Sequence, residues 1–217
     1  TGNGSKLSPK EREIFDLAPG DPLLANLAAA GIAPEAVTAV VFSHLHLDHC
    51  GGASVGTADA PVVAFPRARY FVQRQEWEDA LANRSHMRTS YRRENLAPLA
   101  ESGRLVLLDG AASIFPHVRV EPTPGHTRGH QSVIVSTSAA MLVYLGDLCP
   151  TRSHLRPPYN MAYDLDPYGN MLQKEAMLAR VEREGGWVVF DHDPAVALAR
   201  IERGEDGRYV ALPIGDE

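Results

Sequence analysis

The chain has 217 residues, of which 44% are hydrophobic, and a formal net charge of −6 at pH 7. A chain of this size can bury one sizeable core, and no linker, charge block or repeat divides it, so we expect a single domain over residues 1–217. No run of about 18 apolar residues indicates a membrane span, and the acidic balance argues against nucleic acid as a partner.

The first strong pattern is an apolar segment, residues 37–43, that leads directly into the hexapeptide His-Leu-His-Leu-Asp-His at residues 44–49. If the apolar segment is a strand, His44 and His46 project from the same side and both reach one cation. Leu45 then points away, into packing. This spacing predicts a metal site at the end of a strand.

Asp48 and His49 complete the hexapeptide at a predicted turn, where the change of backbone direction lets them face a second position. The spacing therefore suits two metal ions better than one. Imidazole and carboxylate ligands, without a thiolate, do not choose among zinc, iron, manganese and cobalt, and zinc is the default. The alternative for a short His-rich run is a solvated loop that binds no metal.

A locally basic stretch follows at residues 84–93. It is a candidate contact for an anionic group of a substrate, but we favour a solvated helix face.

Three more candidate ligands follow apolar segments, where buried strands are expected to reach the surface. His126 lies in a turn-rich loop between predicted strands at residues 118–121 and 131–135. Asp147 and His192 each follow a short apolar run. Helical periodicity over the intervening residues 171–184 makes the pattern one of alternating strands and helices, which predicts an α/β fold.

In order, spacing and context, these residues resemble the ligand set of the metallo-β-lactamase superfamily. The resemblance covers nearly the whole chain and implies an αββα sandwich. It also implies a division of the ligands: His44, His46 and His126 hold one metal ion, Asp48, His49 and His192 hold the other, and Asp147 bridges the two.

The implied activity is that of a metal-dependent hydrolase. A hydroxide bridged by two divalent metal ions, about 3.5–4 Å apart, would attack an ester, lactone or phosphoester bond. Asp48 and Asp147 are the expected catalytic residues: Asp48 would carry a proton toward the leaving group, and Asp147 would fix the separation of the ions. The expected cofactors are two divalent ions, zinc by default, and the expected partner is a small-molecule substrate, with the oligomeric state open and a homodimer included.

Four further side chains are expected near the metals without binding them. His130 is frequent in this loop of the superfamily, and we interpret it as a support for the ligands. His154, Tyr159 and Tyr163 lie in a Pro-rich segment after Asp147 that is a candidate pocket lining, with an ordinary packed loop as the equal alternative.

Within the superfamily, residues 70–77, 90–91 and 190–194 resemble the branch of N-acyl homoserine lactonases and of organophosphate hydrolases of the methyl parathion type. Several lactonases carry a tyrosine shortly after the bridging aspartate, whereas residues 148–151 here are Leu-Cys-Pro-Thr. The sequence therefore leaves the substrate open.

Two functions compete with hydrolysis: a redox-active di-iron protein, and a metal-binding module without turnover. In the flavin-coupled di-iron branch an acidic residue usually replaces the second histidine of the hexapeptide, whereas His46 is retained here. The redox-active di-iron function is therefore disfavoured.

Residues 1–6 resemble the turn by which the superfamily leaves an early strand, so we expect the first strands to be missing and assign a cytoplasmic location only by default. Cys50 and Cys149 lie beside predicted ligands. We expect both to be small packing residues without a structural disulfide.

Overall fold

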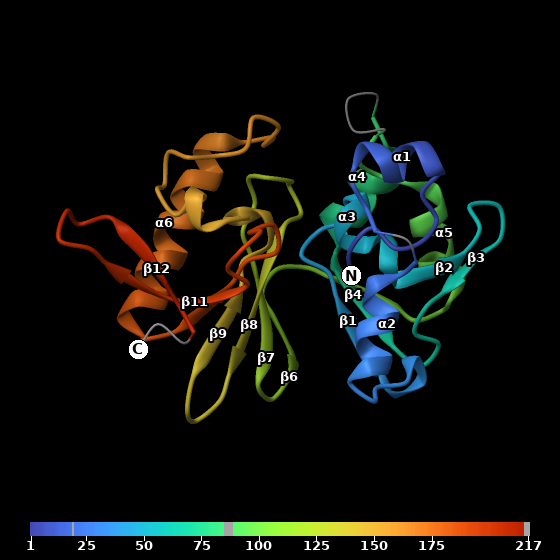
Figure 1. Ribbon diagram of the computed structural model, residues 1–217, viewed down its shortest axis with the longest axis horizontal. Helices are drawn as coiled ribbons and strands as arrows, with labels where there is room; N and C mark the ends of the chain where they lie inside the picture. The colour runs from blue at the N-terminus through green and yellow to red at the C-terminus, as the bar shows by residue number, and fades with distance from the viewer. Residues whose placement is uncertain (19, 85–88, 215–217) are drawn as a thin grey trace. The chain divides into compact units, whose positions relative to one another are not determined.

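The computed structural model describes residues 1–18, 20–84 and 89–214. The chain forms two compact units, Thr1–Leu107 and Leu108–Glu217, coloured blue to green and yellow-green to red in Figure 1. Each unit has its own sheet and hydrophobic core. Residues 85–88, which belong to the basic stretch and include His86, lie outside the described residues.

The first unit combines short helices with a three-stranded sheet of order β1-β4-β5, in which β1 and β4 are parallel, and with an antiparallel pair, β2 and β3. Its elements are α1 (Pro9–Ile14), α2 (Pro22–Ala29), β1 (Ala39–Val41), α3 (Leu47–Cys50), β2 (Ser54–Gly56), β3 (Pro61–Val63), β4 (Arg69–Gln73), α4 (Arg74–Ala82), α5 (Arg93–Glu101) and β5 (Leu105–Leu108).

Strand β1 is shorter than the predicted segment 37–43. A 3₁₀ turn at Pro34–Ala36 precedes it, and the sheet contact ends where the Phe42 N–H donates to the Phe71 oxygen at 3.0 Å. Beyond that point backbone donors bind other partners, so the chain leaves the sheet before His44. Leu45 is fully buried in the core of this unit, as predicted.

The second unit is built on a seven-stranded sheet of order β12-β11-β10-β9-β8-β7-β6. Strands β9 and β10 are parallel, and the other neighbouring pairs are antiparallel. Its elements are β6 (Ala112–Phe115), β7 (Val118–Pro122), β8 (Gln131–Ser136), β9 (Met141–Tyr144), α6 (Pro167–Arg183), β10 (Trp187–Val189), β11 (Leu198–Arg203) and β12 (Tyr209–Pro213).

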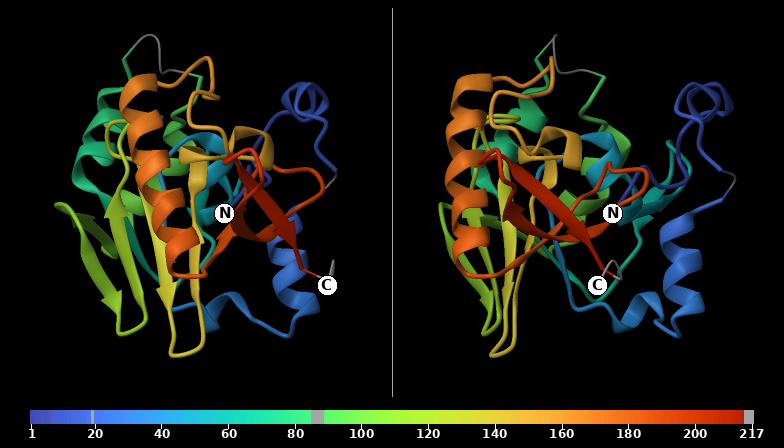
Figure 2. Two further views of the ribbon diagram at one scale, coloured as in Figure 1. Left: turned by 90° about the vertical axis from the view of Figure 1, so that its left-hand side faces the viewer. Right: turned by 60° about the vertical axis from the view of Figure 1, so that its left-hand side comes forward.

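Helix α6 covers one face of this sheet (Figure 2). Its buried residues Met177, Leu178 and Val181 belong to the same core cluster as Val143 and Val188 of β9 and β10. The predicted strands before and after His126 are confirmed as β7 and β8. The predicted helix is also confirmed, but it begins earlier than residue 171, because Asp166 caps its first turn and Pro167 favours a helix start.

Both cysteines are free and fully buried, one in each core cluster, which confirms the expectation of packing residues without a disulfide. Burial raises the pKa of the Cys50 and Cys149 thiols to about 12, so both stay protonated at neutral pH. Among the described helices, none combines the length and the apolar character that crossing a membrane requires.

Candidate metal centre

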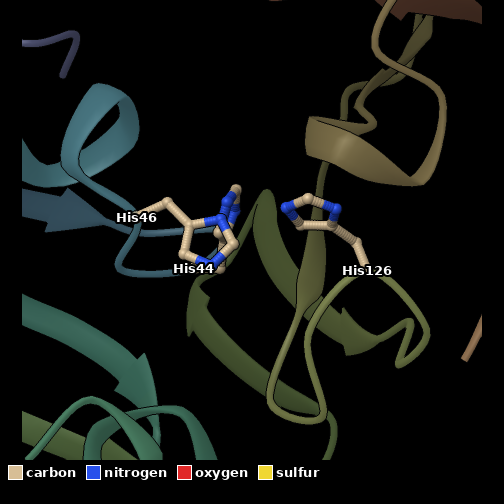
Figure 3. Close-up of side chains that lie close together, drawn as sticks. All are labelled: His44, His46 and His126. Atoms are coloured by element: carbon tan, nitrogen blue, oxygen red, sulfur yellow. The ribbon is translucent and has the colours of Figure 1, made fainter. Parts of the chain in front are cut away.

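His44 and His46 lie on the loop that follows β1 (Figure 3). The His44 side chain is fully buried, and its ring centroid lies 4.5 Å from that of His46, with the two rings nearly perpendicular at 83°. Each of these two histidines offers a ring nitrogen within 4.8 Å of the other. The loop therefore presents two imidazoles to one position, as the spacing predicts, although neither residue lies within the strand.

The short helix α3 takes the place of the predicted turn and positions the other half of the hexapeptide. His46 precedes its first residue, and the His49 N–H donates to the His46 oxygen at 3.0 Å. The His49 ring consequently lies against His44, with 4.0 Å between ring centroids. The Oδ2 atom of Asp48 lies 3.6 Å from Nε2 of His49. The four predicted ligands of the first unit thus lie on α3 or on the loop directly before it.

A buried carboxylate holds this loop in place. Glu76 on α4 is fully buried, and its Oε1 atom accepts hydrogen bonds from the Leu45 N–H (2.9 Å) and the Tyr91 hydroxyl (2.8 Å). The Tyr91 ring in turn lies 5.0 Å from the His46 ring, and burial together with the Glu76 charge raises the Tyr91 pKa. Sequence reasoning missed Glu76, since no spacing signal connects it to the hexapeptide.

In the second unit, Asp147 lies between two histidines. It is buried in a 3₁₀ turn at Gly146–Leu148, directly after β9. Its Oδ2 atom lies 3.1 Å from Nε2 of His126, on the loop between β7 and β8, and its Oδ1 atom lies 3.3 Å from Nε2 of His192, after β10. The two carboxyl oxygens therefore face different histidines.

These separations fit metal ligands. Two ligand atoms at about 2.0–2.2 Å from one zinc ion, at a tetrahedral angle, lie roughly 3.3–3.6 Å apart. The observed nitrogen–oxygen distances of 3.1 and 3.3 Å are close to that range. Imidazole and carboxylate are donors that divalent transition metals accept. Both oxygens of Asp147 therefore lie at distances from a histidine nitrogen that suit metal ligands.

His126 is oriented by a second carboxylate. Its Nδ1 atom donates to Oδ1 of Asp164 at 2.8 Å, and both side chains are fully buried. Because the carboxylate accepts at Nδ1, the proton of the neutral ring lies there and the Nε2 lone pair is directed toward Asp147. Such a pairing of a carboxylate with a histidine is the usual support of a histidine metal ligand. The sequence analysis did not single out Asp164.

His130 supports Asp147 through the backbone. Its Nε2 atom accepts from the Asp147 N–H at 3.1 Å, and its Nδ1 atom donates to the Thr123 hydroxyl at 2.9 Å. The Thr123 hydroxyl lies 3.1 Å from that of Ser132, which donates to the Leu145 oxygen. The fully buried His130 therefore supports the backbone of Asp147, the predicted bridging residue.

Asp191 is a further candidate ligand that the sequence analysis missed. It directly precedes His192, and Asp147, Asp191 and His192 offer ligand atoms within 4.8 Å of one another. The Tyr144 hydroxyl donates to its Oδ2 atom at 3.0 Å. Its position at the polar end of β10 was the available signal.

Of the three residues expected to line a pocket, Tyr163 lies beside a predicted metal ligand, His126. Its ring meets the His126 ring edge-on, with 5.8 Å between centroids, and the side chain is 61% exposed. His154 instead bonds to Thr151, and Tyr159 accepts from Arg156. Burial lowers the His154 pKa.

A model of the metallo-beta-lactamase superfamily matches residues 8–192, which includes every predicted ligand. The chain belongs to the metallo-beta-lactamase superfamily. The resemblance found in the sequence and the predicted α/β fold class are therefore confirmed.

Several curated proteins similar to this chain are named lactonases. The N-acyl homoserine lactonase AttM of Azorhizobium caulinodans is 32% identical over 186 residues, which cover 79% of this chain and 64% of that protein. The chain spans 43 to 64% of the length of the curated lactonases that it matches.

Solved structures show the same fold. A probable metal-dependent hydrolase from Staphylococcus aureus superposes with a TM-score of 0.87 at 25% identity, covering 97% of this chain and 76% of that one. AidC, a dizinc quorum-quenching lactonase solved with its product N-hexanoyl-L-homoserine, superposes with a TM-score of 0.79 at 21% identity, covering 100% and 74% of the two chains.

Proposed function

We propose that this protein is a hydrolase that uses two divalent metal ions, zinc by default, to open a lactone or a related ester or phosphoester bond. The observation that carries the proposal is the position of Asp147, whose two oxygens face His126 and His192. The proposed ligand groups are those of the superfamily: His44, His46 and His126 for one ion, Asp48, His49 and His192 for the other, with Asp147 shared.

When bound, the two ions would supply an activated water at neutral pH and positive charge for the transition state. The chain's own residues then have separate tasks. Asp147 would be shared by the two ligand groups, because one of its oxygens faces His126 and the other faces His192. Asp48 is the more accessible carboxylate, with 36% of its side chain exposed, and it would hand a proton to the leaving group.

A lactone is the first substrate class to test, because the similar curated proteins are named N-acyl homoserine lactonases. Esters and phosphotriesters are the other classes, since the proposed chemistry at a carbonyl or phosphoryl centre is the same. Small, uncharged substrates also agree with a chain whose net charge is negative.

The test is a panel of N-acyl homoserine lactones, carboxylic esters and phosphotriesters, with the metal content measured on the same sample. We expect about two ions per chain and turnover of at least the lactones. His126→Ala should lower the metal content and abolish turnover. His117→Ala changes an exposed histidine at the turn between β6 and β7 and should leave both quantities unchanged. Bound iron, detected by metal analysis and by its absorption in the optical spectrum, together with an absence of hydrolysis would instead favour the di-iron alternative.

A further inference from the structure

Lys174 is a charged side chain that the proposed hydrolysis does not use. It lies on α6 and is only 1% exposed, although lysine is almost never fully buried without partners. Its Nζ atom donates to the backbone oxygen of Tyr159 at 2.5 Å and to Oδ1 of Asn160 at 2.9 Å. The ammonium group therefore binds the segment that precedes the helix.

Asn170, one turn earlier on α6, binds the same segment. Its Nδ2 atom donates to Oδ1 of Asn160 and to Oδ2 of Asp164, both at 3.2 Å. The Asn160 side-chain oxygen thus accepts from both Lys174 and Asn170. This shared acceptor couples the ammonium group to the residue that holds Asp164.

Asp164 carries the connection to the candidate metal centre. One of its oxygens accepts from Nδ1 of His126 (2.8 Å), and the other accepts from the Met161 N–H (3.2 Å) as well as from Asn170. Burying a carboxylate is costly unless donors or charges compensate it. The hydrogen bonds around Asp164 supply that compensation, with the Lys174 cation at the far end of the network.

The backbone follows the same path. The Leu165 N–H donates to the His126 oxygen at 3.2 Å, and the Asp166 N–H donates to the Gly125 oxygen at 2.8 Å. Gly125 packs so closely on α6 that a Cβ atom there would lie 2.5 Å from the Asn170 Cβ atom. The loop that carries His126 is therefore docked on residues 164–166 and on the first turn of α6.

We infer that Lys174 is a positioning residue for His126, acting through Asn160, Asn170 and Asp164. The ammonium group fixes residues 159–164, so that Asp164 holds the His126 ring with its Nε2 lone pair available to a divalent cation. The inference rests on the proposed function only in treating His126 as a metal ligand. The network itself lies entirely within the second unit.

A merely structural role for Lys174 leads to a different expectation. Loss of a buried lysine that only fastens α6 would lower the melting temperature and leave the His126 ring unchanged. A positioning role requires that the ring itself changes: its Nδ1 proton should be held less firmly, and its affinity for a metal should fall. The state of the His126 ring therefore separates the two roles.

The decisive variant is Lys174→Met, which keeps an unbranched stem and removes the ammonium group. Lys10→Met makes the same change at an exposed lysine of α1 and is the control. In metal-free protein labelled with ¹⁵N-histidine, ¹H–¹⁵N correlation should show the Nδ1 proton of wild-type His126 protected from exchange with water by its hydrogen bond to Asp164. We expect this proton to exchange faster in Lys174→Met and at the wild-type rate in Lys10→Met.

Zinc affinity, measured by competition with a chromophoric chelator, is the second readout. Loss of a group that bonds a metal ligand directly weakens metal binding about 10–100-fold. Lys174 acts on His126 only through Asn160, Asn170 and Asp164, so we expect a loss at the lower end, about 10-fold, for one zinc ion in Lys174→Met. Asn160→Leu removes the shared acceptor from a half-buried position and should act in the same direction, so it decides the matter if Lys174→Met does not fold.

An unchanged exchange rate of the His126 Nδ1 proton and an unchanged zinc affinity in the folded variants would overturn the inference, whatever their melting temperatures. The two proposals can fail separately. If wild-type protein binds no zinc, the hydrolytic proposal is wrong, while the exchange rate of the His126 Nδ1 proton in metal-free protein still decides whether Lys174 positions His126.

Discussion

The Nε2 atom of His126 and the Oδ2 atom of Asp147 lie 3.1 Å apart. With the His126 proton held at Nδ1 by Asp164, both facing atoms carry lone pairs. Two such atoms approach closely when a cation lies beside both, either a metal ion or an added proton. The contact therefore links the orientation of one histidine to the need for positive charge at Asp147.

Removing a proposed ligand should abolish turnover. We expect Asp48→Ala and His126→Ala each to lower metal content and to leave hydrolysis near background, because a bound ion would activate the water in the proposed mechanism. Activity assays and elemental analysis on the same samples check this. Full activity in either variant after treatment with a chelator would rule out the metal-dependent mechanism.

Metal binding should also stabilise the fold, since ligands that bind the native state raise its free energy of unfolding. At a free zinc concentration of about 100 times Kd, the gain is roughly 2.7 kcal/mol. Thermal unfolding with and without a chelator measures the effect, and zinc should restore the higher melting temperature. Equal melting temperatures under both conditions would contradict it.

Glu76→Leu should destabilise the first unit by leaving the Leu45 N–H and the Tyr91 hydroxyl without their acceptor. An unsatisfied buried donor costs about 1–3 kcal/mol. Urea unfolding gives the change in the free energy of unfolding. Glu78→Leu, a change at an exposed position of the same helix, is the control and should lie within about 0.5 kcal/mol of wild type.

Gly125→Ala should be more harmful than an ordinary glycine substitution. The added methyl group would overlap Asn170, with 2.5 Å between the two Cβ atoms, so the His126 loop must move away from α6. We expect a loss of roughly 1–3 kcal/mol in stability, together with weaker zinc binding. Gly103→Ala, at a positive φ but with open space around it, isolates the backbone cost and should leave zinc binding intact.

The two cysteines should be unreactive in the folded protein. Burial raises their pKa to about 12, so the thiolate, which is the reactive form, is scarce below pH 9. A thiol reagent such as Ellman's reagent should detect almost no thiol in native protein and two after denaturation in urea. Rapid labelling of the native protein at pH 8 would show that a thiol is accessible.

The sequence by itself determined which side chains are candidate metal ligands. Imidazoles and carboxylates leave a visible pattern when they occur in a short motif or directly after an apolar segment, as in residues 44–49 and at Asp147. The sequence also determined the α/β fold class, because the alternating pattern predicted the strands on either side of His126, which are β7 and β8, and the later helix α6.

Only the tertiary structure decided how these ligands are held. Glu76 accepts from Leu45 across 31 residues of chain, and Asp164 accepts from His126 across 38. Lys174 joins the hydrogen-bond network of Asp164 from helix α6, whose other buried side chains are largely apolar. Such supports are single polar groups without a local spacing rule, because what selects them is the need to satisfy a buried donor or charge wherever folding places it.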